Sequence, residues 1–157
     1  SPLHSDGTVV AMGGFGGKAL AVRTGGSGDV TESHRLWLHP RTKQRIGSGV
    51  IHDGHIYIHN DPGVAECWEL KTGKLAWEQR LVGHGKNNDN WSSLLLANGL
   101  LYSLNKSGDT FVLQASPKFE VVATNSLAEA TMSSIAASEG ELFLRTYQSL
   151  WCVAGKK

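Results

Sequence analysis

A short unit of turn residue, glycine and alternating strand occurs four times along the chain, and this recurrence constrains the fold more than any other feature. Its copies are DGTVVAM from Asp6, DGHIYIH from Asp53, NGLLYSL from Asn98 and EGELFLR from Glu139. Successive copies are 47, 45 and 41 residues apart, measured between the glycines Gly7, Gly54, Gly99 and Gly140. A repeat of this length predicts one supersecondary unit that is stacked several times.

Each copy has further strand-forming segments around this unit. A second alternating segment follows it in every copy, namely KALAV, AECWEL, TFVLQA and LWCVA. A third segment follows in three copies, RLWLH around Trp37, KLAWEQ around Trp77 and EVVATN near Val122, and the later copies are preceded by the short pieces SGVIH, SSLLLA and SSIAAS. Four short strands in roughly 40 to 45 residues are the pattern of a β-propeller blade.

The sequence therefore predicts an all-β fold, a β-propeller of about four blades, each a four-stranded antiparallel sheet. We expect a single propeller segment over residues 1–157, with approximate blades at 1–45, 46–89, 90–130 and 131–157. The fourth copy, LWCVAGKK, stops after its third strand, so the last blade is expected to be incomplete. No spare strand is recognised before Gly7 to cover that edge, and an unpaired edge strand invites another chain.

The glycine-rich stretch GGFGGKAL, residues 13–20, is predicted to be a hairpin turn rather than a phosphate-binding loop. A Walker-type loop needs the pattern G-x-x-x-x-G-K-[ST], but Met12 stands at its first glycine position and Ala19 follows Lys18. Strand-like segments flank the stretch on both sides. Glycine supplies the positive φ angles of a tight hairpin, so the turn is the better interpretation.

Charge and hydropathy exclude several classes of function. Fifteen Lys and Arg balance fourteen Asp and Glu, which leaves a formal charge of +1 and no electrostatic footprint for nucleic acid. No apolar run approaches the roughly 18 residues of a membrane-spanning helix. The chain begins with Ser1 rather than Met, and we expect it to be a processed product or a piece of something longer.

The segment CWELKTGKLAW, from Cys67 to Trp77, is the sharpest local motif. It resembles the A-x-D-x-x-x-G-x-x-x-W pattern of PQQ-like repeats, found in quinoprotein alcohol dehydrogenase-like propellers. In that family the Trp docks between neighbouring blades, over the small residue and the glycine turn. The resemblance implies that Cys67 takes the small position, Gly73 the turn and Trp77 the docking ring. In the first copy it assigns Ala21 and Trp37 to the equivalent positions, and the other copies match less well.

The resemblance also carries expectations about assembly. PQQ-like propellers commonly have seven or eight blades, so the four copies resemble the C-terminal half of a larger ring. The partner implied is the missing half of the propeller, another protein, or a second copy of the chain that completes eight blades.

Candidate metal ligands and thiols are expected to be structural. His55 and His59 cannot share one ion, because residues four apart on a strand are separated by about 13 Å. His52 and His55 could meet across a turn, but two ligands without a third are expected to be loop histidines. We therefore predict no metal site. Cys67 and Cys152 occupy equivalent positions in different copies, so we expect two buried small hydrophobes rather than a disulfide.

Exposed loops on a rigid scaffold are where binding residues concentrate. The polar segment GKNNDNW lies between two strand segments, and we favour it for ligand contact through the residues Asn87, Asn88, Asp89, Asn90 and Trp91. Asn tolerates left-handed turns, so a purely structural role for this segment stays open.

No catalytic set remains once the repeats are accounted for. We expect a non-catalytic scaffold or binding module of a larger bacterial envelope or secreted protein, located in the periplasm, the cell envelope or the extracellular space, as the resemblance implies. One alternative is part of a pyrroloquinoline-quinone-dependent dehydrogenase whose catalytic residues lie outside this chain, and another is a sensory domain appended to a kinase. Such dehydrogenases bind the quinone with calcium and often carry adjacent cysteines, which this sequence lacks, so no cofactor is expected.

Overall fold

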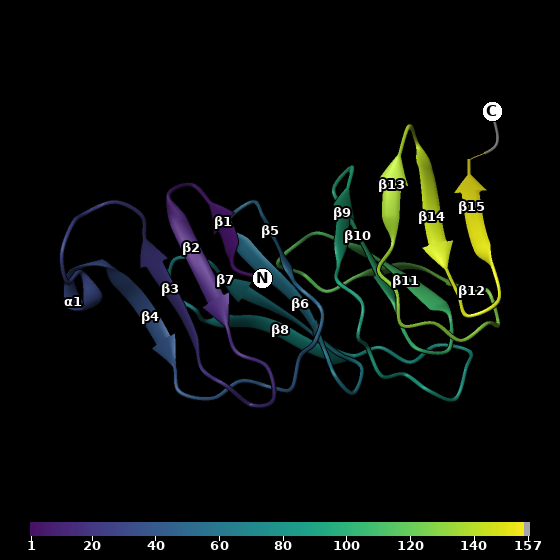
Figure 1. Ribbon diagram of the computed structural model, residues 1–157, viewed down its shortest axis with the longest axis horizontal. Helices are drawn as coiled ribbons and strands as arrows, with labels where there is room; N and C mark the ends of the chain where they lie inside the picture. The colour runs from purple at the N-terminus through teal and green to yellow at the C-terminus, as the bar shows by residue number, and fades with distance from the viewer. Residues whose placement is uncertain (156–157) are drawn as a thin grey trace.

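A computed structural model describes residues 1–155 of the protein, and the end of the predicted fourth blade, residues 156–157, lies outside this part. Fifteen strands and one helix of four residues form within residues 1–155. The strands build four separate antiparallel sheets, each in chain order from strand to neighbouring strand. Figure 1 shows the sheets side by side in an arc, from purple at one end to yellow at the other.

The first two sheets each have four strands in the described residues. The first consists of β1 (Leu3–Ser5), β2 (Thr8–Met12), β3 (Ala19–Arg23) and β4 (Arg35–His39), and the short helix α1 (Thr31–His34) interrupts the connection to β4. The second consists of β5 (Val50–His52), β6 (His55–Asn60), β7 (Val64–Glu69) and β8 (Leu75–Arg80).

The third sheet repeats this plan and the fourth is shorter within residues 1–155. The third consists of β9 (Leu95–Ala97), β10 (Leu100–Leu104), β11 (Asp109–Gln114) and β12 (Val121–Ser126). The fourth consists of β13 (Ala136–Ser138), β14 (Glu141–Arg145) and β15 (Leu150–Ala154). The prediction of β-propeller blades with an incomplete last blade is confirmed for the described residues.

Each recurring turn has the backbone of a tight hairpin. Asp53 and Gly54 both have positive φ angles, 46° and 71°, and the pairs at the other three copies behave alike. Two successive positive φ values define a type I′ turn, which matches the right-handed twist of the strands it joins. The GGFGGKAL stretch is also a turn, because β2 and β3 pair on either side of it.

One strand was missed by the sequence analysis. Residues Leu3–Ser5 form β1, which pairs with β2 and is therefore the inner strand of the first sheet. It is not a spare strand for the open edge. A run of three residues without alternating apolar side chains gives too weak a pattern to recognise alone.

A chain of serines joins the inner strands. The Ser1 amino group donates to Ser48 Oγ at 3.2 Å, the Ser48 backbone N–H donates to Ser93 Oγ at 3.0 Å, and Ser93 donates to Ser134 Oγ at 2.9 Å. Each serine stands two residues before the inner strand of its sheet. Successive sheets are therefore set against one another by the same contact three times.

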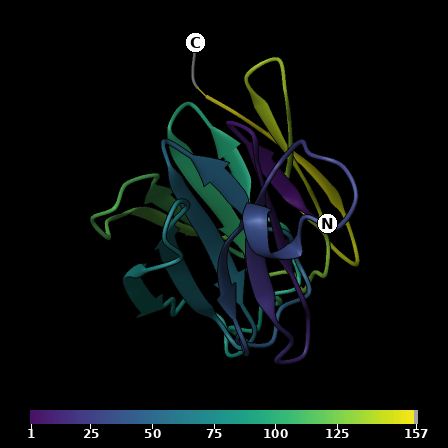
Figure 2. The same ribbon diagram turned by 90° about the vertical axis from the view of Figure 1, so that its left-hand side faces the viewer.

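Apolar side chains fill the space between successive sheets. Val10, Ala21 and Trp37 pack against Ile56 and Trp68 at the first junction. The second junction buries a comparable cluster, whereas the buried apolar members of the third are Leu104, Ile135 and Leu144 among residues 1–155. Figure 2 looks along the row, with α1 and the first sheet nearest the viewer. The core is thus distributed over three junctions.

Candidate functional site

At the first junction, a Trp from one sheet rests on the glycine turn of the next. Trp37 Nε1 donates to the Leu70 carbonyl at 2.8 Å, and the Trp37 side chain lies on β4 opposite Ala21. A Cβ added at Gly73 would lie 2.7 Å from Trp37 Cδ2, so only glycine leaves room for the ring. Gly73 therefore receives the Trp of the preceding sheet rather than that of its own motif.

The second junction uses the same device with a different receiving residue. Trp77 lies opposite Cys67 and donates from Nε1 to the Ser116 carbonyl at 3.0 Å. Its ring meets Phe119 edge-on, with the centroids 5.1 Å apart. In the third sheet Ala123 occupies this register, opposite Val112, so no indole enters the third junction from β12.

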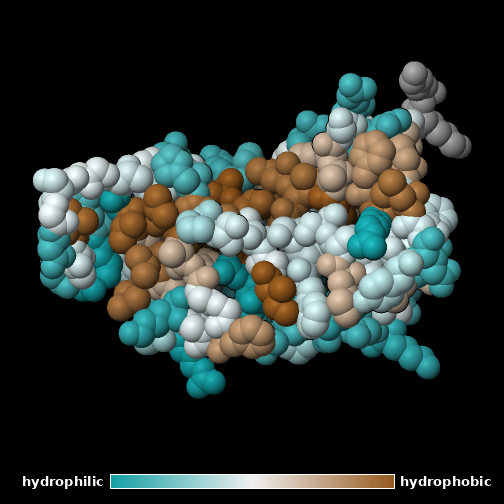
Figure 3. Space-filling model, viewed as in Figure 1, coloured by the Kyte–Doolittle hydropathy of each residue, from teal (hydrophilic) through white to brown (hydrophobic). Residues whose placement is uncertain are grey.

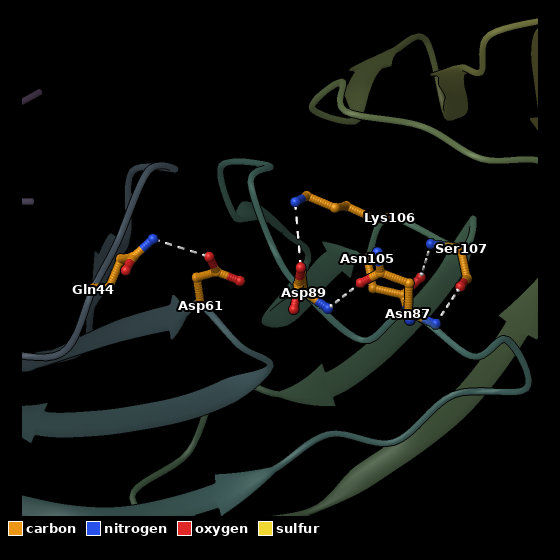
Figure 4. A network of polar contacts seen from close by, with 7 residues as sticks. All are labelled: Gln44, Asp61, Asn87, Asp89, Asn105, Lys106 and Ser107. Carbon is orange, nitrogen blue, oxygen red and sulfur yellow. Dashed lines mark hydrogen bonds and ion pairs between the residues drawn. The ribbon is translucent and has the colours of Figure 1, made fainter. Parts of the chain in front are cut away.

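The loop that joins β8 to β9 carries the predicted binding residues, and the β10–β11 turn holds it in place (Figure 4). The Asn87 backbone N–H donates to Ser107 Oγ at 2.9 Å, and the Asp89 N–H donates to Asn87 Oδ1 at 3.0 Å. Asn88 Oδ1 accepts from the Gly83 N–H at 2.8 Å. The loop conformation is therefore fixed by its own polar groups.

Lys106 links this loop to the third sheet. Its Nζ lies 3.6 Å from the centroid of the Trp91 ring and 3.3 Å from Asp89 Oδ2. Only 14% of the Lys106 side chain is exposed. Solvent therefore screens little of the attraction of its ammonium group to the Asp89 carboxylate and to the Trp91 ring. The Lys106 N–H also donates to the Asp89 carbonyl at 2.9 Å.

Asn90 lies inside the molecule rather than on the loop surface. It is fully buried, and its amide donates to Ser103 Oγ and to the Leu104 carbonyl, each at 3.1 Å. Its Oδ1 and the Trp91 Nε1 are buried without a hydrogen-bond partner among the described residues. Asn90 and Trp91, two of the predicted binding residues, therefore hold the loop on its buried side.

The exposed residues of the loop are Val82, His84, Lys86 and Asn87. A hollow of about 460 Å³ lies beside His84 and Asn87, and Lys106 and Ser107 belong to its lining. The sequence analysis assigned no chemistry to His84.

Asp109 holds the loop at Gly85, a residue that lines this hollow. Its side chain accepts from the Gly85 N–H and from Asn105 Nδ2, both at 3.0 Å. Burial alone would raise the pKa of Asp109, but hydrogen bonds from Ser126, Gly85 and Asn105 outweigh it and lower the pKa. The carboxylate is therefore charged at neutral pH and faces the loop.

A second polar site lies between the first two sheets. Glu66 is buried, and its oxygens accept from Lys43 Nζ at 2.6 Å and from Asn60 Nδ2 at 2.7 Å. A groove of about 660 Å³ runs past Glu66 and Trp68 to the exposed Phe15. Every Glu66 oxygen already has a protein partner, so this cluster is a structural ion pair.

The remaining titratable candidates are dispersed. His52 and His55 face each other across the β5–β6 turn, whereas His59 is buried against Ser103 in the second junction. The described residues contain no group of three or more His, Cys, Asp or Glu that could hold a metal ion. Within residues 1–155, no helix is long and apolar enough to cross a membrane.

The two cysteines differ in exposure, which corrects one expectation. Both are free, but Cys67 is buried and Cys152 is exposed. Cys67 belongs to the buried cluster that includes Leu101 of the third sheet and Leu94, the residue before β9. No sheet follows β15 within residues 1–155, so the equivalent face of the fourth sheet is bare.

Antiparallel sheets of three or four strands in an arc, with a Trp of one sheet docked on the next at two junctions, define the described residues as part of a β-propeller. No protein-family model and no curated protein sequence matches the chain.

Solved structures show the likeness. BamB from Moraxella catarrhalis superposes with a TM-score of 0.71 at 16% identity, over 94% of this chain and 42% of that one. The computationally designed Ika4 protein gives 0.68 at 10% identity, over 98% of this chain and 88% of that one. The quinohemoprotein alcohol dehydrogenase ADHIIG from Pseudomonas putida HK5 gives 0.65 at 14% identity, over 90% and 27%. The chain thus spans less than half the length of BamB, and these likenesses show the fold alone.

Proposed function

We propose that this chain is a non-catalytic propeller segment that binds a partner protein through the β8–β9 loop. The observation that carries the proposal is the fixed conformation of this loop. Hydrogen bonds to Ser107 and within the loop hold its backbone, while His84, Lys86 and Asn87 are presented to solvent. A loop ordered before binding loses little conformational entropy on association, which favours recognition.

The chemistry of the loop indicates the kind of surface that it would recognise. His84 and Asn87 contribute hydrogen-bonding groups to a hollow of about 460 Å³, and Lys106 lines it as well. Lys86 adds an exposed cation on the loop between His84 and Asn87. Such a surface suits a polar or acidic segment of a partner protein. Asn88, Asp89, Asn90 and Trp91 support it from beneath, through the contacts that order the loop.

A photo-crosslinking amino acid at position 86 tests the proposal directly. The protein should form a discrete crosslinked species in the cells that make it, and purified wild-type chain should compete for that species. A chain carrying His84→Ala and Asn87→Ala should compete at least about tenfold less well. The control places the crosslinker at Lys118, an exposed residue of the β11–β12 turn. Equal crosslinking from both positions would contradict a role for the loop.

The fold is shared with quinone-dependent dehydrogenases, so membership of such an enzyme is the alternative to test. Pyrroloquinoline quinone and calcium are added to the chain, and the quinone absorbance is followed. A saturable spectral change would favour the dehydrogenase alternative. Our proposal expects none, since Asp89 is paired with Lys106 and Asp109 is buried with Oδ2 bonded to Asn105.

We further propose that the bare face of the fourth sheet is covered in the functional protein, by the rest of a larger ring or by a second copy. Leu150 and Cys152, alternate residues of β15, are exposed there. Light scattering decides between these for the isolated chain, since a dimer would have twice the mass of 16.9 kDa. The PQQ-like resemblance further supports a location in the cell envelope or outside the cell.

A further inference from the structure

The third junction lacks the ring that fills the first two. Trp37 and Trp77 stand opposite the small residues Ala21 and Cys67 and enter the following sheet. At the same register the third sheet has Ala123, opposite Val112. An indole side chain is thus replaced by a methyl group, and the receiving sheet does not close the difference.

The receiving side of the junction is also reduced. Trp68 pairs with Ile56 across the hairpin of the second sheet, and Val153 pairs with Leu142 at the equivalent place in the fourth. Two large aromatic side chains of the first junction, Trp37 and Trp68, thus have small counterparts in the third. Removing large side chains from a packed interior leaves space that the surroundings fill only partly.

The structure contains the resulting cleft. A cavity of about 170 Å³ lies between the third and fourth sheets, and its apolar lining consists of Tyr102, Val112, Leu127, Leu142, Leu144 and Val153. A wider hollow of about 470 Å³ adjoins it through Tyr102, Leu142 and Val153. In Figure 3 the apolar residues, coloured brown, continue onto the part of the surface formed by this last sheet.

The dimensions and chemistry of the cleft fit one kind of occupant. Apolar cavities of about 150 Å³ are large enough to hold a benzene ring, and this one is slightly larger. Asn125 brings an amide to its rim, so a ring with one polar group would be satisfied at its edge. The chain itself shows that this register accepts an indole, with its N–H bonded to a carbonyl.

We propose that the cleft between the third and fourth sheets binds a small planar aromatic molecule of about the size of indole. The molecule occupies the one described junction that receives no counterpart of Trp37 or Trp77. Its ring lies among Tyr102, Leu144 and Val153, and its polar group faces the rim. This site lies apart from the β8–β9 loop and does not depend on the function proposed for that loop.

Titration calorimetry with indole as the probe tests the proposal on the whole chain. The wild type should bind one indole saturably, and amide chemical shifts should change at Tyr102, Val112, Leu144 and Val153. Ala123→Trp supplies the ring from the chain itself, so indole binding should weaken at least about tenfold. Val122→Trp adds the same side chain on the opposite face of β12, where Val122 is exposed, and should bind indole like the wild type.

A second variant keeps the test decisive if Ala123→Trp does not fold. Val153→Trp narrows the cleft from the fourth sheet with the side chain that the second sheet already carries as Trp68, and it should also weaken binding. The proposal is overturned if the wild type shows no saturable binding, or if a folded Ala123→Trp protein binds indole unchanged. Shift changes at His84 and Asn87 instead of the cleft would equally overturn it.

Discussion

The contact between Trp37 and Gly73 makes a sharp prediction for the Gly73→Ala variant. Gly73 has φ +69°, a left-handed value that costs an L-residue about 1–2 kcal/mol. The added methyl group would also lie 2.7 Å from Trp37 Cδ2 and 2.9 Å from His39 Nε2. Overpacking of this kind costs about 1–3 kcal/mol, so Gly73→Ala should lower the free energy of unfolding by about 2–5 kcal/mol.

Gly54 supplies a matched control for the backbone part of this cost. Its φ is +71°, and a Cβ added there meets nothing within 4 Å. Gly54→Ala should therefore cost only the strain of about 1–2 kcal/mol. Because both changes replace Gly by Ala, their effects on the unfolded chain cancel in the comparison.

The steric part is isolated by repeating the substitution without the ring. In a Trp37→Ala background the main overlap is gone, so Gly73→Ala should cost little more than Gly54→Ala. Urea unfolding followed by circular dichroism measures all four proteins of this double-mutant cycle. We expect a coupling energy of about 1–3 kcal/mol between the two sites. Additivity within about 0.5 kcal/mol would refute the docking argument.

Three further outcomes follow from buried groups. Burial lowers the pKa of His59 to about 4, below its ordinary value of 6.5. The unfolded state therefore takes up a proton before the folded state does as the pH falls. The free energy of unfolding should drop by about 3 kcal/mol between pH 6.5 and pH 4. His59→Gln should remove that part of the slope, and an unchanged pH profile would contradict the assignment. Burial raises the pKa of the Cys67 thiol to about 11, whereas Cys152 is exposed. A thiol reagent should therefore label Cys152 alone in the native chain and both cysteines after unfolding. Labelling of both at equal rates in the native chain would show that the second junction opens. Lys43→Met leaves the Glu66 carboxylate buried with Asn60 as its remaining partner, and should lower the free energy of unfolding in urea by about 1–3 kcal/mol. This loss is smaller than for a fully buried pair, because the Lys43 ammonium is partly exposed. A change below about 0.5 kcal/mol would mean that solvent already screens the pair.

The sheets could be predicted from the sequence because their signal is local and recurs. A turn residue before each glycine, followed by an alternating strand, fixes the hairpin and which face is buried. The inner strand β1 (Leu3–Ser5) was not predicted, because three residues with one apolar side chain show no alternating pattern. Its signal was the serine two residues ahead: Ser1, Ser48 and Ser93 stand at the same distance from their strands and make the same contact.

Side-chain direction in the loop could not be predicted in the same way. Asn87 and Asn90 have the same residue type and belong to one polar segment, yet Asn87 is exposed and Asn90 is fully buried. The difference comes from the Leu104 carbonyl, which belongs to another strand and accepts from Asn90. Exposure of Cys152 was unpredictable for a related reason, because it depends on which sheet covers the face rather than on the residue itself.

The imperfect repeats are best understood from the steric fit at each junction. Gly73 is required where the flat face of Trp37 lies on the turn, since any Cβ would overlap the ring. Phe119 receives Trp77 at the second junction, where the two rings meet edge-on at an interplanar angle of 65° and pack without a glycine. The receiving residue thus changes together with the docking geometry. At the third junction Ala123 replaces the ring, and among the described residues the fourth sheet has no larger side chain to fill the space. This is the junction where the structure has an apolar cleft.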